Sequence, residues 1–327
     1  MDLSIVTTLY KSAPFICEFY ERAVAAAGRV VDDFEIVFVN DGSPDDSLTI
    51  AMSIADRDPR VKVIDLSRNF GHHHAVFAGL KEAAGKRVFL LDVDLEEQPE
   101  WLDQFWATLE ETRSDVVYGI ADQRHGSFFK QVSGKLFYKL FNVASEVPIP
   151  ANVCTVRLMS RRYLGALLSF GESSLFMAGL FAWAGFCQIP LVVSKQRRRG
   201  ASNYHLLRLT GLFIRAITSF SSYPLWIVFV LGVMLTALSF SAGAYLVVRK
   251  LLSPDTVFLG YASMMVSLWF LGGLIISFIG VIGLYLAEIF VEAKRRPQYI
   301  IRQTYTVSNS LVRTAGVGRA RGDFHEY

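Results

Sequence analysis

The sequence predicts an α/β domain with a mostly parallel sheet, followed by an amphipathic helix and two membrane-spanning helices. Short β-branched runs alternate with helical patterns at the start of the chain, and an amphipathic helical pattern and two long uncharged apolar segments follow later. The hydrophobic fraction of 52% and the mean hydropathy of +0.34 are high for a soluble enzyme. Part of the chain is therefore expected to lie in a membrane.

The first part of the chain has the pattern of a βαβ series. The predicted strands are "LSIVTTLY", "FEIVFVN", "VKVIDLS", "RVFLLDVD" and "DVVYGI". Segments 47–57 and 74–84, which carry apolar residues at helical spacing, lie between them. This alternation predicts helices on both faces of the sheet and a ligand site at the carboxyl ends of the strands. Helices near 128–143 and 161–170 and an edge strand, "FCQIPLVVSK", complete the predicted domain over residues 1–200.

Two long segments are candidates for membrane spans. No charged residue occurs between Arg215 and Arg249 or between Asp255 and Glu288, and each gap exceeds the about 20 residues that a spanning helix needs. Two core helices of a soluble protein would be the alternative, but they would be unusually long and uniformly apolar. The predicted span cores are Leu225–Val248 and Gly260–Ala287.

The charges around these segments predict their orientation. Basic residues are concentrated before the first span and after the second, at Lys195, Arg197, Arg198, Arg199, Lys294, Arg295 and Arg296. The positive-inside rule therefore places the globular domain and both termini in the cytoplasm. The N-terminus has no signal-peptide pattern, which agrees with this orientation. The remaining boundaries are a helix lying in the membrane interface at 201–222, a two-helix hairpin at 223–290 and a basic tail at 291–327.

The interfacial helix is predicted from a two-sided pattern. Apolar residues recur at three- and four-residue steps, whereas Arg208 and Arg215 share the opposite face. An amphipathic helix packed on the globular domain remains the alternative. The apolar positions are Leu206, Leu209, Phe213, Ile217 and Phe220.

Acidic residues at strand ends point to the chemistry. Asp92 and Asp94 follow an apolar run and are two residues apart, so both carboxylates can face one site, and Glu96 can join them if the chain turns there. Hard oxygen ligands of this kind suit Mg²⁺ or Mn²⁺, which commonly also binds phosphate oxygens of a substrate. The implied ligand is a diphosphate. Solvated loop acids would be the alternative.

Other site classes receive no support. No GxGxxG follows the first strand, and the chain has neither a GxxxxGK[ST] nor a GxSxG motif. Neighbouring histidines on a helix diverge by about 100°, so His72, His73 and His74 are interpreted mostly as surface or packing residues. The three cysteines are too few and too widely spaced for a disulfide framework. A net charge of +3 with a pI near 8.7 lacks the strong basic bias of a nucleic-acid binder.

Taken together, an ordered set of motifs resembles the family 2 glycosyltransferases with a GT-A fold, especially the bacterial polyprenyl-phosphate glycosyltransferases and dolichol-phosphate mannose synthase. The resemblance covers nearly the whole chain. The motifs are "SIVTTLY", "VNDGSPDDS", "SRNFGHHHAVFAGL", "LLDVDLEEQPE" with its DxD, "RLMSR", "RRRGASNY" and "GLYLAEIFVEAKRRPQYIIR".

The resemblance implies an inverting, metal-dependent transfer of one sugar from a nucleotide sugar, with a UDP-sugar favoured. The implied acceptor is polyprenyl (undecaprenyl) phosphate at the cytoplasmic face of the bacterial inner membrane. Mg²⁺ or Mn²⁺ would bind at Asp94 and Glu96, and Asp92, Asp94 and Arg197 would carry the catalysis. The implied nucleotide-binding residues are Thr8, Tyr10, Asp41 and Asp92. The implied binding residues for the acceptor phosphate are Arg124, Lys130, Lys135, Arg197, Ser202 and Tyr204.

Three departures from the family pattern bear on this reading. The usual PxYNE of the first strand is replaced by residues 8–12, "TLYKS", which leaves the choice of nucleotide base open. Ala121 and Thr155 stand where relatives often have an arginine and an aspartate. The missing acid matters little if the nucleophile is a phosphate monoester, because its second pKa of about 6 leaves it largely ionised at neutral pH.

Three other functions are weighed against this one. A processive polysaccharide synthase would need more spans and a QxxRW motif, whereas Gln196 is followed by three arginines. A transferase that extends an already glycosylated lipid would share the DxD and the membrane anchor. A catalytically inert scaffold would not need the intact acids. The small residues Gly272, Gly273, Gly280 and Gly283 in the second span could support helix packing between protomers of a homo-oligomer. Small residues also occur in lone hairpins, so a monomer stays the alternative.

Overall fold

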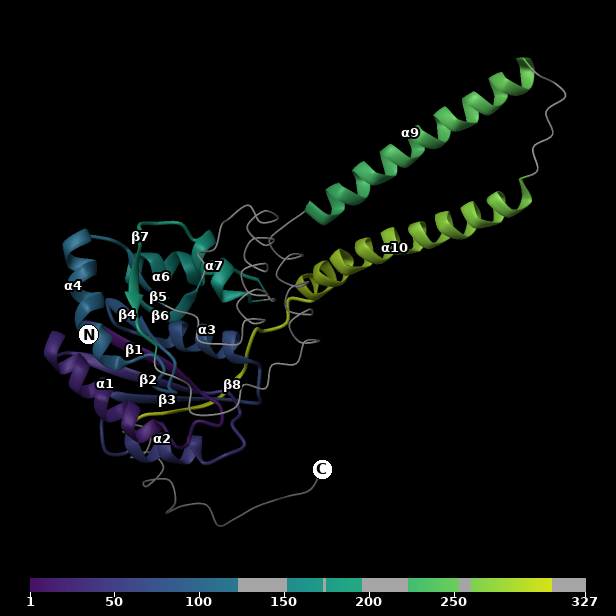
Figure 1. Cartoon of the computed structure of the whole chain (residues 1–327). Coiled ribbons are helices and arrows are strands. Elements are labelled where there is room, and N and C mark those ends of the chain that lie inside the picture. The colour runs from purple at the N-terminus through teal and green to yellow at the C-terminus, as the bar shows by residue number, and fades with distance from the viewer. Residues whose placement is uncertain (123–151, 173–174, 196–222, 253–259, 308–327) are drawn as a thin grey trace, which may run out of the picture. The chain divides into compact units, whose positions relative to one another are not determined.

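The computed structural model describes residues 1–122, 152–172, 175–195, 223–252 and 260–307. Within these residues, eight strands form one sheet in the order β7-β5-β6-β4-β1-β2-β3-β8 (Figure 1). The strands are β1 (Leu3–Leu9), β2 (Phe34–Asn40), β3 (Val61–Leu66), β4 (Arg87–Leu90), β5 (Val116–Ala121), β6 (Val153–Ser160), β7 (Gln188–Val193) and β8 (Ile301–Tyr305).

The sheet is mostly parallel, as the sequence predicts. β1 pairs in parallel with β2 and β4, β2 with β3, and β5 with β7. β6 runs antiparallel to β4 and β5, and β8 runs antiparallel to β3. The ends of the parallel strands and the starts of β6 and β8 therefore meet at one side of the sheet, which we call the carboxyl edge.

Helices cover both faces of the sheet, because successive strand residues point to opposite sides. On one face, Phe19 packs edge-on against Phe38, and Phe105 packs edge-on against Phe89. On the other face, α3 comes so close to β1 and β2 that a Cβ at Gly79 would lie 2.6 Å from a methyl group of Val6. The helices of this unit are α1 (Ile16–Val30), α2 (Ser47–Ala55), α3 (His72–Glu82), α4 (Leu102–Thr112), α6 (Arg161–Leu168) and α7 (Met177–Trp183), with a 3₁₀ turn, η1 (Pro99–Trp101), before α4.

A separate unit contains the two long apolar helices, α9 (Tyr223–Leu252) and α10 (Tyr261–Ala293). Their most apolar windows, Pro224–Ala242 and Phe270–Ala293, are long enough to cross a membrane, and the protein buries none of either window. A core helix of a soluble protein would be buried, so this exposed apolar surface favours the membrane interpretation over the alternative. The predicted interfacial helix at 201–222 and the predicted helix near 128–143 lie outside the described residues.

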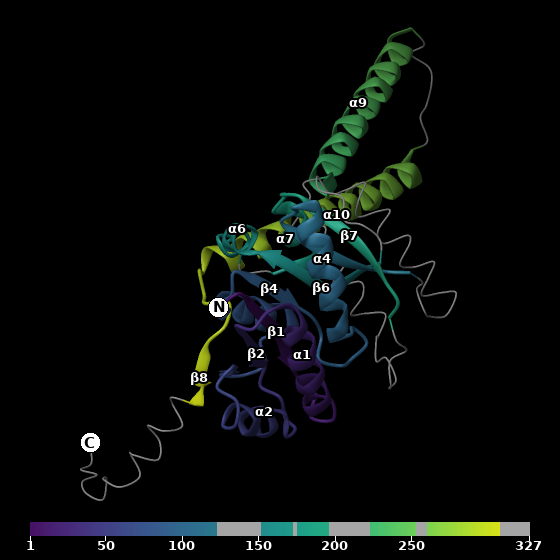
Figure 2. The ribbon, with the colours of Figure 1, turned by 90° about the vertical axis from the view of Figure 1, so that its left-hand side faces the viewer.

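The last strand was not predicted. Residues 301–305, which fall in the expected basic tail, form β8, which pairs with β3. β8 is the yellow strand below the N-terminus in Figure 2. Arg302 makes an ion pair with the buried Asp65, with 3.2 Å between Nη1 and Oδ2. The backbone N–H of Ser67 also donates to the carbonyl of Ile300 at 2.9 Å. The chain therefore returns to the sheet after α10.

Candidate active site

The carboxyl edge brings together residues from five separate parts of the chain. Asp41 follows β2, Asp92 follows β4, and Thr8 lies near the end of β1. Thr155 lies near the start of β6, and Lys195 follows β7. The sequence predicts a site at this edge, and Thr8, Asp41 and Asp92 all lie there in the structure.

Asp41 holds the loop that enters α3. Its carboxylate is buried and accepts hydrogen bonds from the backbone N–H groups of Phe70 at 2.7 Å and Gly71 at 3.0 Å. Burial raises the pKa of Asp41, and these two hydrogen bonds oppose that shift. Gly71, with φ of 99°, precedes the first residue of α3, His72. Asp41 therefore fixes where α3 begins.

His72 connects two of the predicted nucleotide-binding residues. Its Nδ1 forms a hydrogen bond of 3.1 Å with Thr8 Oγ1, and its Nε2 lies 3.7 Å from Asp92 Oδ1. The surrounding protein lowers the pKa of the His72 imidazole. The nearby carboxylates of Glu97, Asp41 and Asp94 oppose that shift. His72 is therefore part of the site, and its side chain is exposed enough, at 47%, to meet a ligand.

The histidines are interpreted from the sequence mostly as surface or packing residues, which describes His73, whereas the exposed His72 also contacts Thr8. His73 Nδ1 lies 2.9 Å from the carbonyl oxygen of Leu175, and its ring packs edge-on against Phe176. That histidine joins α3 to the segment before α7. His72 was missed as a site residue because the sequence does not show which side chain of the helix faces β1 and β4.

The DxD acids are crowded. Desolvation by the surrounding protein raises the pKa of Asp92 to about 6, and the negative charges of Asp94 and Glu96 add to the rise. Leu95, between the last two, has a left-handed backbone with φ of 61°. This turn lets Asp94 Oδ1 accept a hydrogen bond from the backbone N–H of Glu96 at 3.2 Å.

Crowded carboxylates of this kind fit a divalent cation. A cation beside Asp94 and Glu96 would remove the repulsion that disfavours the ionised form of Asp92. Among the described residues, no group of three or more His, Cys, Asp or Glu side chains is arranged to hold a metal by itself. An ion bound here would therefore need further oxygen ligands from water or from a substrate, as Mg²⁺ commonly does.

Behind these acids lies a buried charge pair that the sequence motifs do not predict. Glu97 is fully buried, and its Oε1 lies 2.9 Å from the Nζ of Lys195. Glu97 also accepts hydrogen bonds from the backbone N–H groups of Asp92 at 3.3 Å and Thr155 at 3.0 Å. The sequence gives no sign of this pair, because its two members are far apart along the chain.

Most of the other predicted site residues lie outside the part of the chain that the structure describes. Tyr10 lies just past β1 with its side chain exposed, and its backbone N–H donates to Ser12 Oγ at 3.1 Å. The residues expected to bind the acceptor phosphate lie outside the described residues. They are Arg124, Lys130, Lys135, Arg197, Ser202 and Tyr204.

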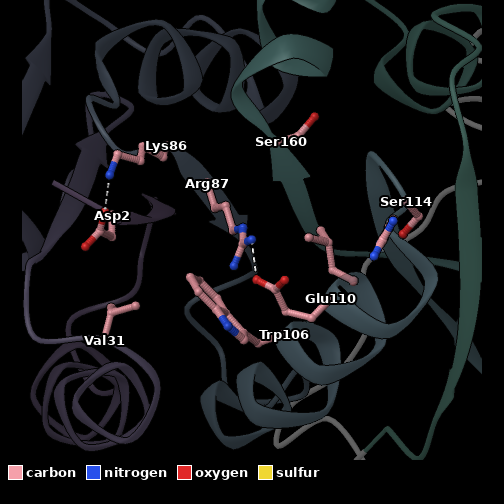
Figure 3. A pocket seen from close by; sticks show the side chains of 10 residues that line it. Asp2, Val31, Lys86, Arg87, Trp106, Glu110, Ser114 and Ser160 are labelled. Carbon is pink, nitrogen blue, oxygen red and sulfur yellow. Dashed lines mark hydrogen bonds and ion pairs between the residues drawn. The ribbon is translucent and has the colours of Figure 1, made fainter.

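A pocket of about 580 Å³ lies at the opposite edge of the sheet, near the starts of β1 and β4 (Figure 3). Arg87 lies over the ring of Trp106 at 4.1 Å and forms an ion pair with Glu110. Lys86 is paired with Asp2 at 2.8 Å. These cations already have anionic partners, and none of the predicted site residues lines the pocket. It is therefore distinct from the candidate active site.

Comparison with known proteins finds the same family that the sequence motifs resemble. Residues 4–168 match the family model described as glycosyl transferase family 2. The chain belongs to this family. As a family 2 glycosyltransferase it is an enzyme, and the inert-scaffold alternative is not favoured.

Two relatives span almost the same length as this glycosyltransferase. One, from Mycobacterium tuberculosis, is described as a putative glycosyltransferase and is 43% identical over 93% of this chain and 89% of its own. Another, from Shigella flexneri, is named SfII prophage-derived bactoprenol glucosyl transferase and is 34% identical over 93% of this chain and 99% of its own. Among solved structures, the chain is similar to glucosyl-3-phosphoglycerate synthase from Mycobacterium tuberculosis, which was solved in complex with Mn²⁺, UDP-glucose and phosphoglyceric acid. The two are 18% identical, and the match has a TM-score of 0.46 and covers 66% of this chain and 77% of the other.

Proposed function

We propose that this glycosyltransferase moves one sugar from a nucleotide sugar to polyprenyl phosphate at the cytoplasmic face of the membrane, with inversion at the anomeric carbon. One observation carries the proposal. The carboxyl edge that gathers Asp41, Asp92 and Asp94 is also the edge at which the chain leaves the sheet after β7 and returns to it at β8. Along the chain, the two apolar helices lie between β7 and β8. The name of the Shigella relative, a bactoprenol glucosyl transferase, supports the same acceptor class.

The connection after α10 limits how far the site can be from the membrane. Only the segment 294–300 joins α10 to β8, and it reaches at most about 28 Å when fully extended. If α10 crosses the bilayer, the start of β8 can therefore lie no farther than this from the end of that helix. A phosphate on a polyprenyl chain would lie near the lipid headgroups, because its hydrocarbon tail stays in the bilayer.

The donor would bind over the DxD acids. Asp94 and Glu96 would hold Mg²⁺ or Mn²⁺, which supplies positive charge to the diphosphate of the leaving nucleotide when it is bound. Thr8, Tyr10, Asp41 and Asp92 would contact the nucleotide from the same edge. Asp41 also accepts hydrogen bonds from the loop that enters α3. A UDP-sugar is the donor that the family resemblance favours.

The acceptor does not need a strong base at Thr155. A phosphate monoester has a second pKa of about 6, so its oxygen is largely ionised before it attacks the anomeric carbon. What it needs is placement next to the donor and screening of its charge. Arg124, Lys130, Lys135 and Arg197 are the candidates for that role, with Ser202 and Tyr204 as hydrogen-bonding partners. A single in-line displacement inverts the anomeric carbon.

The proposal is tested with the full-length protein in membranes or detergent. Polyprenyl phosphate, Mg²⁺ or Mn²⁺ and a panel of labelled UDP-, GDP- and dTDP-sugars would be supplied. We expect one donor to give an acid-labile labelled lipid, and a chelator to abolish the product. Label that appears only on preformed lipid-linked glycans, or no lipid product from any donor, would contradict the proposal.

A further inference from the structure

Glu97 and Lys195 form a largely buried ion pair directly beside the DxD acids. Glu97 has no exposed surface, and the Lys195 side chain is only 26% exposed. Burying two charges costs several kcal/mol of desolvation for each ion, so such a pair is weak evidence for added stability. A buried pair beside reactive acids calls for another explanation.

The hydrogen bonds and the ion pair of Glu97 lead to different parts of the site. Its Oε2 accepts the backbone N–H of Asp92, the first acid of the DxD. Its Oε1 accepts the backbone N–H of Thr155 and pairs with the Lys195 ammonium. Lys195 directly precedes "QRRRG" at 196–200, which contains the arginine expected to reach a phosphate. One carboxylate thus connects the donor-binding loop, the start of β6 and the chain just after β7.

The contacts exclude a role for Glu97 as a base that replaces the acid missing at Thr155. Both carboxylate oxygens are occupied by donors, and the group has no exposed surface through which a nucleophile could reach it. Burial and the charge of Asp92 raise the pKa of Glu97 to about 7, and Lys195 opposes this rise.

We propose that Glu97 and Lys195 are positioning residues that fix the Asp92 backbone and the chain just after β7 relative to each other, and so align the donor and acceptor phosphates. The inference rests on the proposed function. It assigns the pair to the alignment of two anions rather than to contact with either. A misplacement of about 1 Å in such an arrangement can lower a reaction rate about 100-fold.

The test uses Lys195→Met and Glu97→Gln in the full-length protein. Nucleotide affinity is measured by calorimetry, and KM for polyprenyl phosphate and kcat are measured in the transfer assay. Lys195→Met keeps the hydrogen bond between Glu97 and Asp92, so we expect its nucleotide Kd to stay within about threefold while KM for the lipid rises about tenfold or more. Glu97→Gln alters the contacts to both sides and is expected to weaken both. Lys195→Arg, which keeps the cation, should restore the KM for the lipid to within about threefold.

A matched control breaks another ion pair at the opposite edge of the sheet. Arg162 pairs with the largely buried Asp115 at 2.8 Å. Arg162→Met should therefore lower the melting temperature and leave both the nucleotide Kd and the KM for polyprenyl phosphate unchanged. If Lys195→Met behaves like Arg162→Met, with normal constants for both substrates, the pair is structural only and the inference fails.

The proposed function and the inference can fail separately. Wild-type protein that labels no polyprenyl phosphate would contradict the proposed function, whatever the variants do. Wild-type protein that does label it, together with Lys195→Met at the wild-type KM for the lipid, would overturn only the role of the pair. Unchanged nucleotide affinity in Glu97→Gln would overturn that role without any transfer assay.

Discussion

At the scale of single residues, the site depends on which side chain of a short motif faces the sheet. Three histidines begin α3, and successive residues on a helix are rotated by about 100°, so they face three different surroundings. His72 meets Thr8 and Asp92, whereas His73 meets Leu175. Neighbours in sequence therefore have separate functions in the structure.

We predict that His72→Ala weakens donor binding. The substitution removes the hydrogen bond to Thr8 and the imidazole beside Asp92, and a single hydrogen bond contributes about 0.5–1.5 kcal/mol, so a three- to tenfold rise in nucleotide Kd is expected. His74→Ala is the control, because that histidine lies on the same turn and has no contact with Thr8 or Asp92 in the described structure. Equal nucleotide affinities in the two variants, measured by calorimetry, would remove His72 from the site.

A second residue-scale prediction concerns the metal. Asp94→Asn removes one negative charge from the DxD cluster, so the dependence of nucleotide binding on Mg²⁺ or Mn²⁺ should be lost while the fold is kept. The control is Asp103→Asn on α4, an exposed acid whose partner is Arg29. Titration of nucleotide with and without the metal checks the prediction. Metal-stimulated binding that persists in Asp94→Asn would count against this carboxylate as the ligand.

The sequence was a good guide to acids at strand ends and a poor guide to their neighbours. Asp41 and Asp92 could be predicted because a parallel sheet collects the ends of its strands at one edge. The burial of Glu97 could not be predicted, because it depends on Lys195, which β7 brings to the same edge. In the sequence, a solvated acid cannot be told from a buried, paired acid until the order of the strands is known.

At the scale of elements, the turn after β2 packs closely against the loop that leads into α3. Gly42 has φ of 58°, and a Cβ there would lie 2.5 Å from the backbone nitrogen of Asn69. Asn69 belongs to the loop whose next two residues donate to Asp41. The turn and the loop before α3 are therefore packed backbone against backbone, and only glycine satisfies both constraints.

We predict that Gly42→Ala destabilises the protein and weakens donor binding together. Backbone strain of this kind costs about 1–3 kcal/mol, and the clash pushes the α3 loop away from Asp41. Gly28→Ala in α1 is the matched control. A Cβ there meets nothing within 4 Å, so a gain of about 0.5–1 kcal/mol in the free energy of unfolding is expected. Thermal unfolding and nucleotide titration of both variants check this, and normal donor affinity in Gly42→Ala would show that the loop adapts.

The strands that the sequence did not reveal are β6 and β8. β1 to β5 and β7 are short runs rich in β-branched and aromatic residues, which is why the pattern predicted them. β8 has the sequence "IRQTY" and follows a long apolar helix, and it is held by partners in β3 far away along the chain. The ion pair between Arg302 and Asp65 depends on that pairing. Pairing of this kind is set by the whole sheet and leaves no local signal.

At the scale of the whole molecule, β8 adds an argument about topology that is independent of charge. β7 and β8 belong to the same sheet, and the two apolar helices lie between them in the chain. A chain that leaves a domain and returns to it must cross the membrane an even number of times in between. If α9 crosses, α10 must cross back. This agrees with the orientation that the basic flanks predict.

The final prediction tests this topology with membrane-impermeant thiol reagents on intact cells and on inverted vesicles. Cys17, Cys154 and Cys187 would first be replaced by serine, and one cysteine would then be introduced at Asp255, in the link between the helices, or at Ser308, just after β8. Asp255→Cys should react from outside intact cells, whereas Ser308→Cys should react only in inverted vesicles. Restoring the exposed Cys17 alone supplies the control for the globular domain, and it should match Ser308→Cys. Labelling of Asp255→Cys and Cys17 from the same side would mean that the helices do not form a membrane hairpin, and the site would lose its proposed access to a lipid acceptor.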